Sequence, residues 1–242
     1  MLKARVRGRG SRHLLARGRP PIAGMMLIRF LLALLAVCIP AAASAQTDAP
    51  FAPHMRAFAA LDAKAMPAPG GILFLGSSSI TFWSTLAADF PGLPVLNRGV
   101  GGSMIADSVR YADRVVLPYK PRTIVFYAGD NDIAAGHAPE QVLADFQALV
   151  DVVHTTLPQT RILFVSIKPS IKRWAEIADI RRANALIAAY TAQTPQLGFI
   201  DIFPAMLGPD GLPRPELFLP DGLHMTRPGY LIWRDAILPY LQ

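Results

Sequence analysis

Short apolar runs alternate with longer amphipathic segments from residue 70 to the end of the sequence. The apolar runs are residues 71–75, 95–96, 123–128, 161–167 and 199–202. They are continuously apolar, which is typical of strands that are buried on both faces of a sheet. Helical patterns lie between and after them, in residues 103–116, 139–156, 174–193 and 228–240. This alternation predicts a parallel sheet covered by helices.

A different composition precedes the first strand. Residues 46–69 are rich in Ala and Pro, with a short helix predicted around residues 54–62. We expect an N-terminal extension over 46–69 and a single domain over 70–242. The roughly 197 residues from 46 onward are enough for one domain to bury most of its apolar surface.

The first 45 residues have the pattern of a secretory signal peptide. They contain eight Lys and Arg residues and no acidic residue, followed by an apolar run at 30–39 and the small residues Ala43-Ser44-Ala45. The run is shorter than the roughly 20 apolar residues that span a bilayer. We therefore expect cleavage after Ala45, a secreted or periplasmic protein, and no stable membrane insertion after cleavage.

Two features of this leader leave alternatives open. The basic stretch is long, so that Met25 or Met26 is a candidate for the true start. A membrane anchor and a lipoprotein signal are the other interpretations, the latter because Cys38 follows Leu35-Ala36-Val37. Val37 is not the small residue that usually precedes a lipidated cysteine.

Removal of the leader changes the charge of the protein. The whole chain has 24 Lys and Arg residues against 17 Asp and Glu residues, and cleavage leaves 16 against 17. The high isoelectric point therefore belongs to the leader, and no nucleic-acid-binding surface is predicted. The single cysteine, Cys38, leaves with the leader, which excludes disulfides and a thiol nucleophile.

Three serines follow the first predicted strand, in Gly76-Ser77-Ser78-Ser79-Ile80. In open parallel sheets ligands bind beyond the carboxyl ends of the strands, where such turns lie. A serine there can occupy a helix N-terminus, whose free N–H groups favour the negative charge that nucleophilic attack creates. The alternative is a helix N-cap, for which serine is a preferred residue.

Two further loops after strands carry candidate polar groups. The segment 97–103 holds three glycines in four positions, which permits close approach to a ligand or forms a plain tight turn. The segment 129–132 reads Gly-Asp-Asn-Asp, and the Asn131 amide could donate to an oxyanion or form an Asx-turn. We expect no metal there, because no nearby His or further carboxylate has a ligand spacing. No cofactor is implied.

Asp221 precedes His224 by three residues on one predicted loop near the end of the chain. This spacing lets the carboxylate accept the imidazole N–H and hold the tautomer that takes a proton from serine. The alternative is a surface Asx-turn with an incidental His. His137 lies in the loop after Asn131 and is a weaker candidate for substrate contact.

In this order the four segments resemble the SGNH (GDSL-type) hydrolase superfamily, over nearly all of residues 70–242. The resemblance implies a flavodoxin-like three-layer α/β/α sandwich with a five-stranded parallel sheet in the order 2-1-3-4-5. It implies that Ser78 is the nucleophile and that Asp221 and His224 complete the triad. It also implies an oxyanion hole formed by Ser78, Gly102 and Asn131.

The usual Gly-Asp-Ser of the first block reads Gly76-Ser77-Ser78 here. The missing Asp is normally a supporting residue, so the chemistry should survive. Its absence leaves Ser77 and Ser79 as alternatives to Ser78. The segments Gly76–Ile80 and Ser166–Ser170, with Arg173-Trp174, resemble a branch of bacterial members that carry G-S-S-S-I.

The predicted function is hydrolysis of carboxylic esters on a small-molecule or glycan substrate, with short acyl or O-acetyl groups favoured by the short loops. The alternatives are lysophospholipase or thioesterase action on longer chains, or a non-catalytic carbohydrate- or envelope-binding module. Four residues are candidates for substrate binding: Trp83, Lys168, Arg173 and Trp174. Core packing is the alternative for the aromatic residues and simple solvation for the charged ones.

Overall fold

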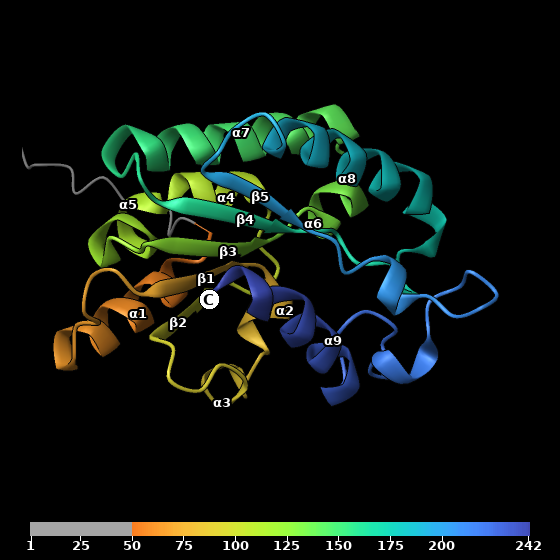
Figure 1. The fold of residues 1–242 in the computed structure, drawn as a ribbon, viewed down its shortest axis with the longest axis horizontal. Coiled ribbons are helices and arrows are strands. Elements are labelled where there is room, and N and C mark those ends of the chain that lie inside the picture. Colours follow the sequence, from red (N-terminus) through yellow and green to blue (C-terminus); the bar gives the residue numbers. More distant parts are fainter. Residues whose placement is uncertain (1–49) are drawn as a thin grey trace, which may run out of the picture. The chain divides into compact units, whose positions relative to one another are not determined.

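A five-stranded sheet, with every neighbouring pair parallel, forms the centre of the computed structural model, which describes residues 50–242 (Figure 1). The strands are β1 (Ile72–Gly76), β2 (Val95–Gly99), β3 (Thr123–Tyr127), β4 (Arg161–Val165) and β5 (Leu197–Ile200). They lie in the order β2-β1-β3-β4-β5, which confirms the predicted fold class and strand order. The chain direction across the sheet switches at β1, so a crevice is expected at the carboxyl ends of β1 and β3.

The carboxyl ends of three neighbouring strands are level. Gly76 at the end of β1 is paired with Gly99 on β2 and with Tyr127 on β3. The loops that follow these strands therefore start side by side, although they are separated by 20 or more residues in the sequence. All five residues of β1 and of β3 are buried, whereas the edge strand β2 is partly exposed.

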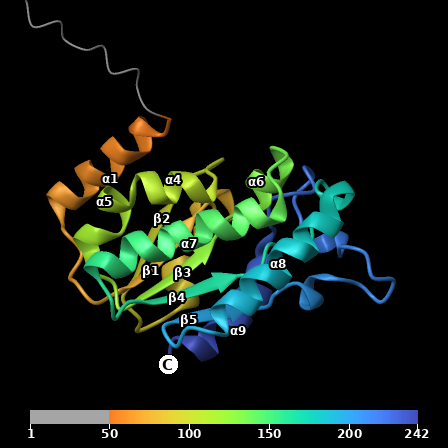
Figure 2. The same cartoon turned by 90° about the horizontal axis from the view of Figure 1, so that it is seen from above.

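Helices cover one face of the sheet, as seen from above in Figure 2. They include α4 (Ile105–Arg110), α5 (Ala112–Val115), α7 (Pro139–Thr156) and α8 (Ile177–Thr191). The predicted helix over 103–116 is broken into two because the backbone of Tyr111 leaves the helical conformation, with φ −107° and ψ 12°. Phe126, Phe146 and Phe164 pack together in the core beneath this layer.

The opposite face is covered by α2 (Ser78–Thr81), α3 (Leu86–Asp89) and α9 (Arg227–Ile237). Trp83, Tyr127 and Trp233 form the aromatic centre of this second core. The remaining elements are the short helix α6 (Asp130–Ala134) and the 3-10 turns η1 (Leu117–Tyr119), η2 (Trp174–Glu176), η3 (Pro204–Met206), η4 (Pro215–Leu217) and η5 (Leu238–Tyr240).

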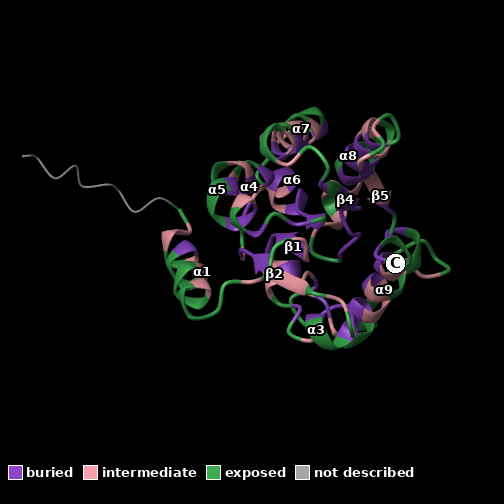
Figure 3. Ribbon diagram, turned by 60° about the vertical axis from the view of Figure 1, so that its left-hand side comes forward, coloured by how far each residue is buried: buried purple, intermediate pink, exposed green. Residues whose placement is uncertain are grey.

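The predicted N-terminal extension contains α1 (Ala52–Lys64), which is longer at both ends than the short helix expected there. Met55 belongs to the same core as α5 and the sheet, and Figure 3 shows the buried side of α1. Asp62 pairs with Arg98 and accepts a hydrogen bond from the Tyr119 hydroxyl. From residue 50 onward the extension is therefore part of one compact unit with the sheet.

The predicted signal peptide over residues 1–45, with Met25, Met26 and Cys38, lies outside the described residues. Between residues 50 and 242, no helix has the length and apolar character needed to cross a bilayer.

Candidate active site

Gly76 makes the sharp turn from β1 into α2. Its φ is 138°, and a Cβ at this position would lie 1.8 Å from the carbonyl oxygen of Tyr127. Only glycine fits both requirements. The next N–H, that of Ser77, donates to the same Tyr127 carbonyl at 3.0 Å. The chain then enters α2 with Ser78 as its first residue.

The three adjacent serines have different environments. Ser77 is 0% exposed and its hydroxyl has no partner, while Ser79 is 1% exposed and accepts a hydrogen bond from the Lys168 ammonium. Ser78 is half-buried, and its Oγ lies 3.0 Å from Nε2 of His224. Of the three hydroxyls, the structure thus brings that of Ser78 to the histidine.

His224 is oriented by Asp221, as the three-residue spacing suggests. Its Nδ1 lies 2.6 Å from Asp221 Oδ2, and Asp221 Oδ1 accepts from the N–H groups of Leu223 and His224 at 2.9 and 3.0 Å. The Leu223 N–H, then the His224 ring, lower the pKa of Asp221 from 3.8 to about 2. An ionised carboxylate can only accept, so Nδ1 donates to it and Nε2 is left to accept from the Ser78 hydroxyl.

An aromatic ring borders this relay. Phe82, just after α2, has its ring centroid 4.8 Å from that of His224 in an edge-to-face arrangement. Half of Phe82 is exposed. It therefore offers an apolar surface beside the histidine.

The loop after β2 is held against the Ser78 turn. The Val100 N–H donates to the Gly76 carbonyl at 2.8 Å, and Gly102 adopts a φ of 79°. Asn131 on α6 joins the same loop, because its side-chain amide donates to the Ser103 carbonyl at 3.0 Å. These contacts place the predicted oxyanion residues in neighbouring loops.

Three N–H donors in these loops are available to a ligand. Over residues 50–242, the backbone N–H groups of Ser78 and Gly102 have no acceptor. The Asn131 amide uses one of its two hydrogens for Ser103 and keeps the other. Free N–H donors of this kind are the groups that stabilise an oxyanion.

Trp83 does not line the site, and its prediction as a substrate-binding residue is wrong. It is 1% exposed, packs against Phe74 and Tyr230, and donates its indole N–H to Asp89 at 2.6 Å. The hydrogen bond satisfies its one polar group inside the core, which is the alternative that the sequence left open.

Lys168 is also buried, at 1% exposure, so the prediction that it meets substrate is wrong as well. Its ammonium donates to Tyr127 Oη at 2.9 Å, Asp130 Oδ2 at 3.0 Å and Ser79 Oγ at 3.2 Å. Burial opposes ionisation of Asp130, but the ammonium outweighs it and lowers the pKa of that carboxyl. Lys168 therefore joins α2 to α6 from beneath the site.

Arg173 and Trp174 are half-buried in the segment that leads into η2. This segment lies against the triad loop, since the Lys172 N–H donates to the Gly222 carbonyl at 3.0 Å and Ile171 packs beside Gly222. Contact of Arg173 or Trp174 with substrate stays a prediction.

The reason given for expecting no metal near Asn131 does not hold in the structure. Asp132, His137 and Asp145 bring one potential ligand atom each to within 4.8 Å of one another. His137 returns to α6 through a turn, and Asp145 comes from α7, so that no local spacing in the sequence indicates the cluster.

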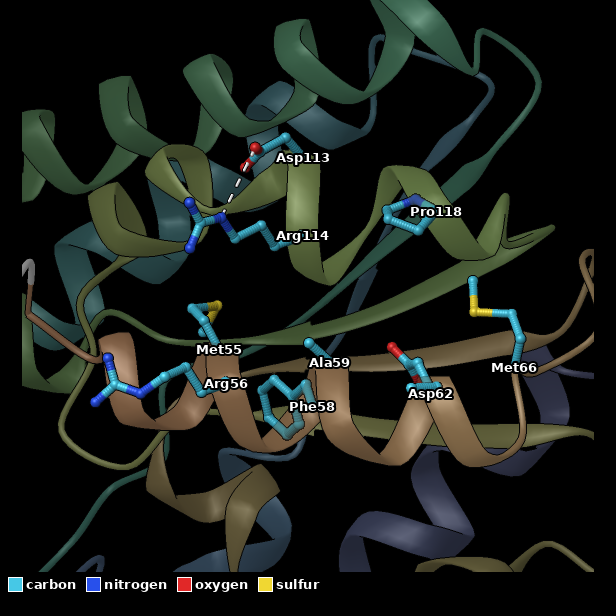
Figure 4. Close-up of a pocket in the computed structure, with 10 residues that line it drawn as sticks. Met55, Arg56, Phe58, Ala59, Asp62, Met66, Asp113, Arg114 and Pro118 are labelled. Atoms are coloured by element: carbon cyan, nitrogen blue, oxygen red, sulfur yellow. Dashed lines mark ion pairs between the residues drawn. The ribbon is translucent and has the colours of Figure 1, made fainter.

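A pocket of about 640 Å³ lies away from these residues, between α1 and the segment from α5 to η1 (Figure 4). Met55, Phe58 and Pro118 are among the residues that line it. None of the predicted site residues does. The triad is instead accessible from solvent directly, with the Asp221 side chain 40% and the His224 side chain 22% exposed.

Comparisons with known proteins agree with this geometry. The sequence profile of the GDSL-like Lipase/Acylhydrolase family matches residues 74–232, which include Ser78, Asn131, Asp221 and His224. Platelet-activating factor acetylhydrolase IB subunit alpha1 from Bos taurus is 28% identical over 168 residues, covering 66% of this chain and 69% of that protein.

Solved structures share the fold. A GDSL-like lipase from Bacteroides thetaiotaomicron matches with a TM-score of 0.65 at 19% identity, covering 77% of this chain and 96% of that one. A mutant of an acetyl-xylooligosaccharide esterase from Geobacillus matches with a TM-score of 0.57 at 17% identity, over 72% of this chain and 95% of that one. Because the family profile covers well over half of its length, the chain belongs to the GDSL-like lipase/acylhydrolase family of carboxylic ester hydrolases.

Proposed function

We propose that the protein is a serine esterase that hydrolyses short-chain esters, with O-acetyl groups on carbohydrate as the favoured substrate class. The observation that carries this proposal is the hydrogen-bonded relay from Ser78 Oγ to His224 Nε2 at 3.0 Å and from Nδ1 to Asp221 at 2.6 Å. Such a relay prepares a hydroxyl for attack on a carbonyl carbon.

The reaction runs in two halves. Ser78 Oγ attacks the ester carbonyl while His224 takes its proton, and the resulting tetrahedral intermediate expels the alcohol, which receives that proton. A water molecule then attacks the acyl-enzyme, again giving its proton to His224, and the proton returns to Ser78 as the carboxylic acid leaves. Asp221 stays ionised and holds the imidazole throughout.

The oxyanion of each intermediate is stabilised by the free N–H groups of Ser78 and Gly102 and by the second amide hydrogen of Asn131. These donors come from three neighbouring strand ends, which the level register of β1, β2 and β3 brings together. Removal of one such donor typically lowers turnover by roughly 100- to 1,000-fold. We expect a loss of this size in Asn131→Ala, with the fold retained.

The preference for a small acyl group is supported by the open position of the triad and by the half-exposed ring of Phe82 beside His224. A long acyl chain needs an extended apolar groove, and the 640 Å³ pocket near α1 is not lined by triad residues. The names of similar proteins point the same way, because they include an acetylhydrolase and an acetyl-xylooligosaccharide esterase.

Covalent labelling tests the catalytic proposal. The wild-type protein should react with a fluorophosphonate probe, and Ser78→Ala should lose both labelling and hydrolysis of an aryl acetate. Ser77→Ala is the matched control, since its buried hydroxyl has no hydrogen bond to lose. Absence of labelling in the wild type would support a non-catalytic binding module, and a labelled Ser78→Ala would place the nucleophile elsewhere.

A substrate series tests the acyl and alcohol parts separately. We expect kcat/KM to fall from aryl acetate to butyrate to octanoate, and acetylated sugars to be deacetylated. A rise with chain length would favour the lysophospholipase or thioesterase alternative.

Export is part of the proposal and rests on the pattern of residues 1–45. N-terminal sequencing of protein recovered from the periplasm or medium should find Gln46 as the first residue. A lipid-modified Cys38 in the membrane fraction would contradict this.

A further inference from the structure

Asp132, His137 and Asp145 form a side-chain cluster that the proposed hydrolytic mechanism does not use. One potential ligand atom from each lies within 4.8 Å of the other two. Asp132 is on α6, His137 follows the turn at Gly136, whose φ is 87°, and Asp145 is on α7. The His137 N–H donates to the Asp132 carbonyl at 3.0 Å, which fixes the turn that returns the imidazole to α6.

Two atoms of this cluster are buried without a hydrogen-bond partner. Asp132 is 0% exposed; its Oδ1 accepts from the Ile105 N–H at 3.1 Å, but its Oδ2 has no donor. Nδ1 of His137 is likewise buried and unpartnered. Buried polar atoms are nearly always paired in folded proteins, so two unpartnered atoms in one cluster point to a ligand that both residues can bind.

The charge of the cluster points to a cation. Among the residues that the structure describes, no Lys or Arg forms an ion pair with Asp132 or Asp145. The Gln141 side-chain amide, a neutral donor, is the partner of Asp145.

We propose that Asp132, His137 and Asp145 bind a divalent transition-metal ion, for which Zn²⁺ is the natural probe. One imidazole nitrogen and two carboxylate oxygens are ligands that Zn²⁺ accepts, and a water molecule completes a tetrahedral site. The three atoms already lie within 4.8 Å of one another, so ligand bonds of roughly 2.0–2.2 Å require at most small side-chain movements. His137 and Asp145 are half-buried at the surface and can rotate toward the fully buried Asp132.

The position of the site gives the ion a structural role next to the catalytic residues. Asp132 directly follows Asn131, and its other oxygen holds the first N–H of α4, close to the Gly102 loop. A bound ion would tie α6 to α7 and so restrict the movement of Asn131. The ion itself takes no part in the proposed hydrolysis, and this inference does not depend on that proposal.

Zinc content and thermal unfolding test the site in the full mature protein. After chelator treatment, incubation with ZnCl₂ and gel filtration, we expect one Zn²⁺ per chain by elemental analysis. At free Zn²⁺ about 100 times the dissociation constant, the unfolding midpoint should rise by about 5–10 °C. His137→Gln and Asp145→Asn should each lose the bound zinc and most of this rise.

His54→Gln is the matched control. Its imidazole is on α1, packs against Phe51 and also has an unpartnered Nδ1, but it lies outside the cluster. This variant should keep the zinc. Asp145→Asn leaves the buried Asp132 in place, so its circular dichroism spectrum should match the wild type and separate loss of metal from loss of fold. Wild type without bound zinc, or variants that bind it as the wild type does, would overturn the proposal.

Discussion

Replacing Lys168 by methionine would leave the Asp130 carboxylate buried without its cation. The two groups are 3.0 Å apart, and their side chains are only 1% and 3% exposed. Methionine keeps the unbranched stem of lysine, so that packing changes little and the substitution isolates the loss of charge. Removing one partner of a buried ion pair typically costs about 3–5 kcal/mol.

We expect the cost of Lys168→Met to lie within that range. The ammonium has three hydrogens and three partners, Tyr127, Asp130 and Ser79, so each of its hydrogens has an acceptor. Its loss leaves a charged acceptor and two hydroxyl groups without their hydrogen-bond donor. Because domains of this size are stable by only about 5–15 kcal/mol, we expect the unfolding midpoint to fall by roughly 6–20 °C.

Urea unfolding at pH 7 of four proteins provides the assay: wild type, Lys168→Met, Asp130→Asn and the double variant. Asparagine keeps an oxygen for the Asn131 N–H, which Asp130 Oδ1 accepts at 3.1 Å, but carries no charge. The double variant should therefore be more stable than Lys168→Met alone. A cost below about 1 kcal/mol for Lys168→Met, or a double variant as unstable as the sum of both single changes, would refute the reasoning.

Three other predictions follow from single contacts. Chiefly because of its hydrogen bonds with Arg227, Asp89 has a pKa lowered from 3.8 to about 2. About 2 kcal/mol of stability is thus present above pH 4 and is lost as the pH falls toward 2. Urea unfolding should show this loss in the wild type but not in Asp89→Asn. Gly76→Ala should not yield soluble folded protein, since its Cβ would lie 1.8 Å from the Tyr127 carbonyl; a wild-type circular dichroism melt would disprove this. With its pKa near 2, Asp221 should stay ionised above pH 4. The pH profile of kcat/KM should therefore show no acid-side ionisation from this carboxyl above pH 4.

The positions of the strands could be predicted because burial on both faces leaves a continuous apolar run. The apolar run at 123–128 matches β3 to within one residue, and β4 occupies the first part of the run at 161–167. The break within a helix could not be predicted from the sequence in the same way. The pattern over 103–116 is continuous in the sequence, yet the backbone at Tyr111 divides it, while the Tyr111 hydroxyl bonds to the Pro50 carbonyl far away in the chain.

The candidate site shows the same contrast between local and distant information. Asp221 and His224 contact each other through a turn of four residues, which the spacing alone suggests. How deeply a side chain is buried depends on distant parts of the chain. Lys168 follows the fourth strand in the sequence, but it is buried against Asp130, which follows β3. The Asp132 cluster was missed for a similar reason, since α7 supplies one of its members.

Chain order has a consequence for how the relay forms. Ser78 and His224 are 146 positions apart, and the contacts that hold them in register come from α9, where Arg227 pairs with Asp89 and the Tyr230 hydroxyl donates to the Ser79 carbonyl. A polypeptide that lacks α9 would keep Ser78 and the sheet but lose both of these contacts. The contact between Ser78 and His224 therefore depends on α9, an element that follows both residues in the sequence.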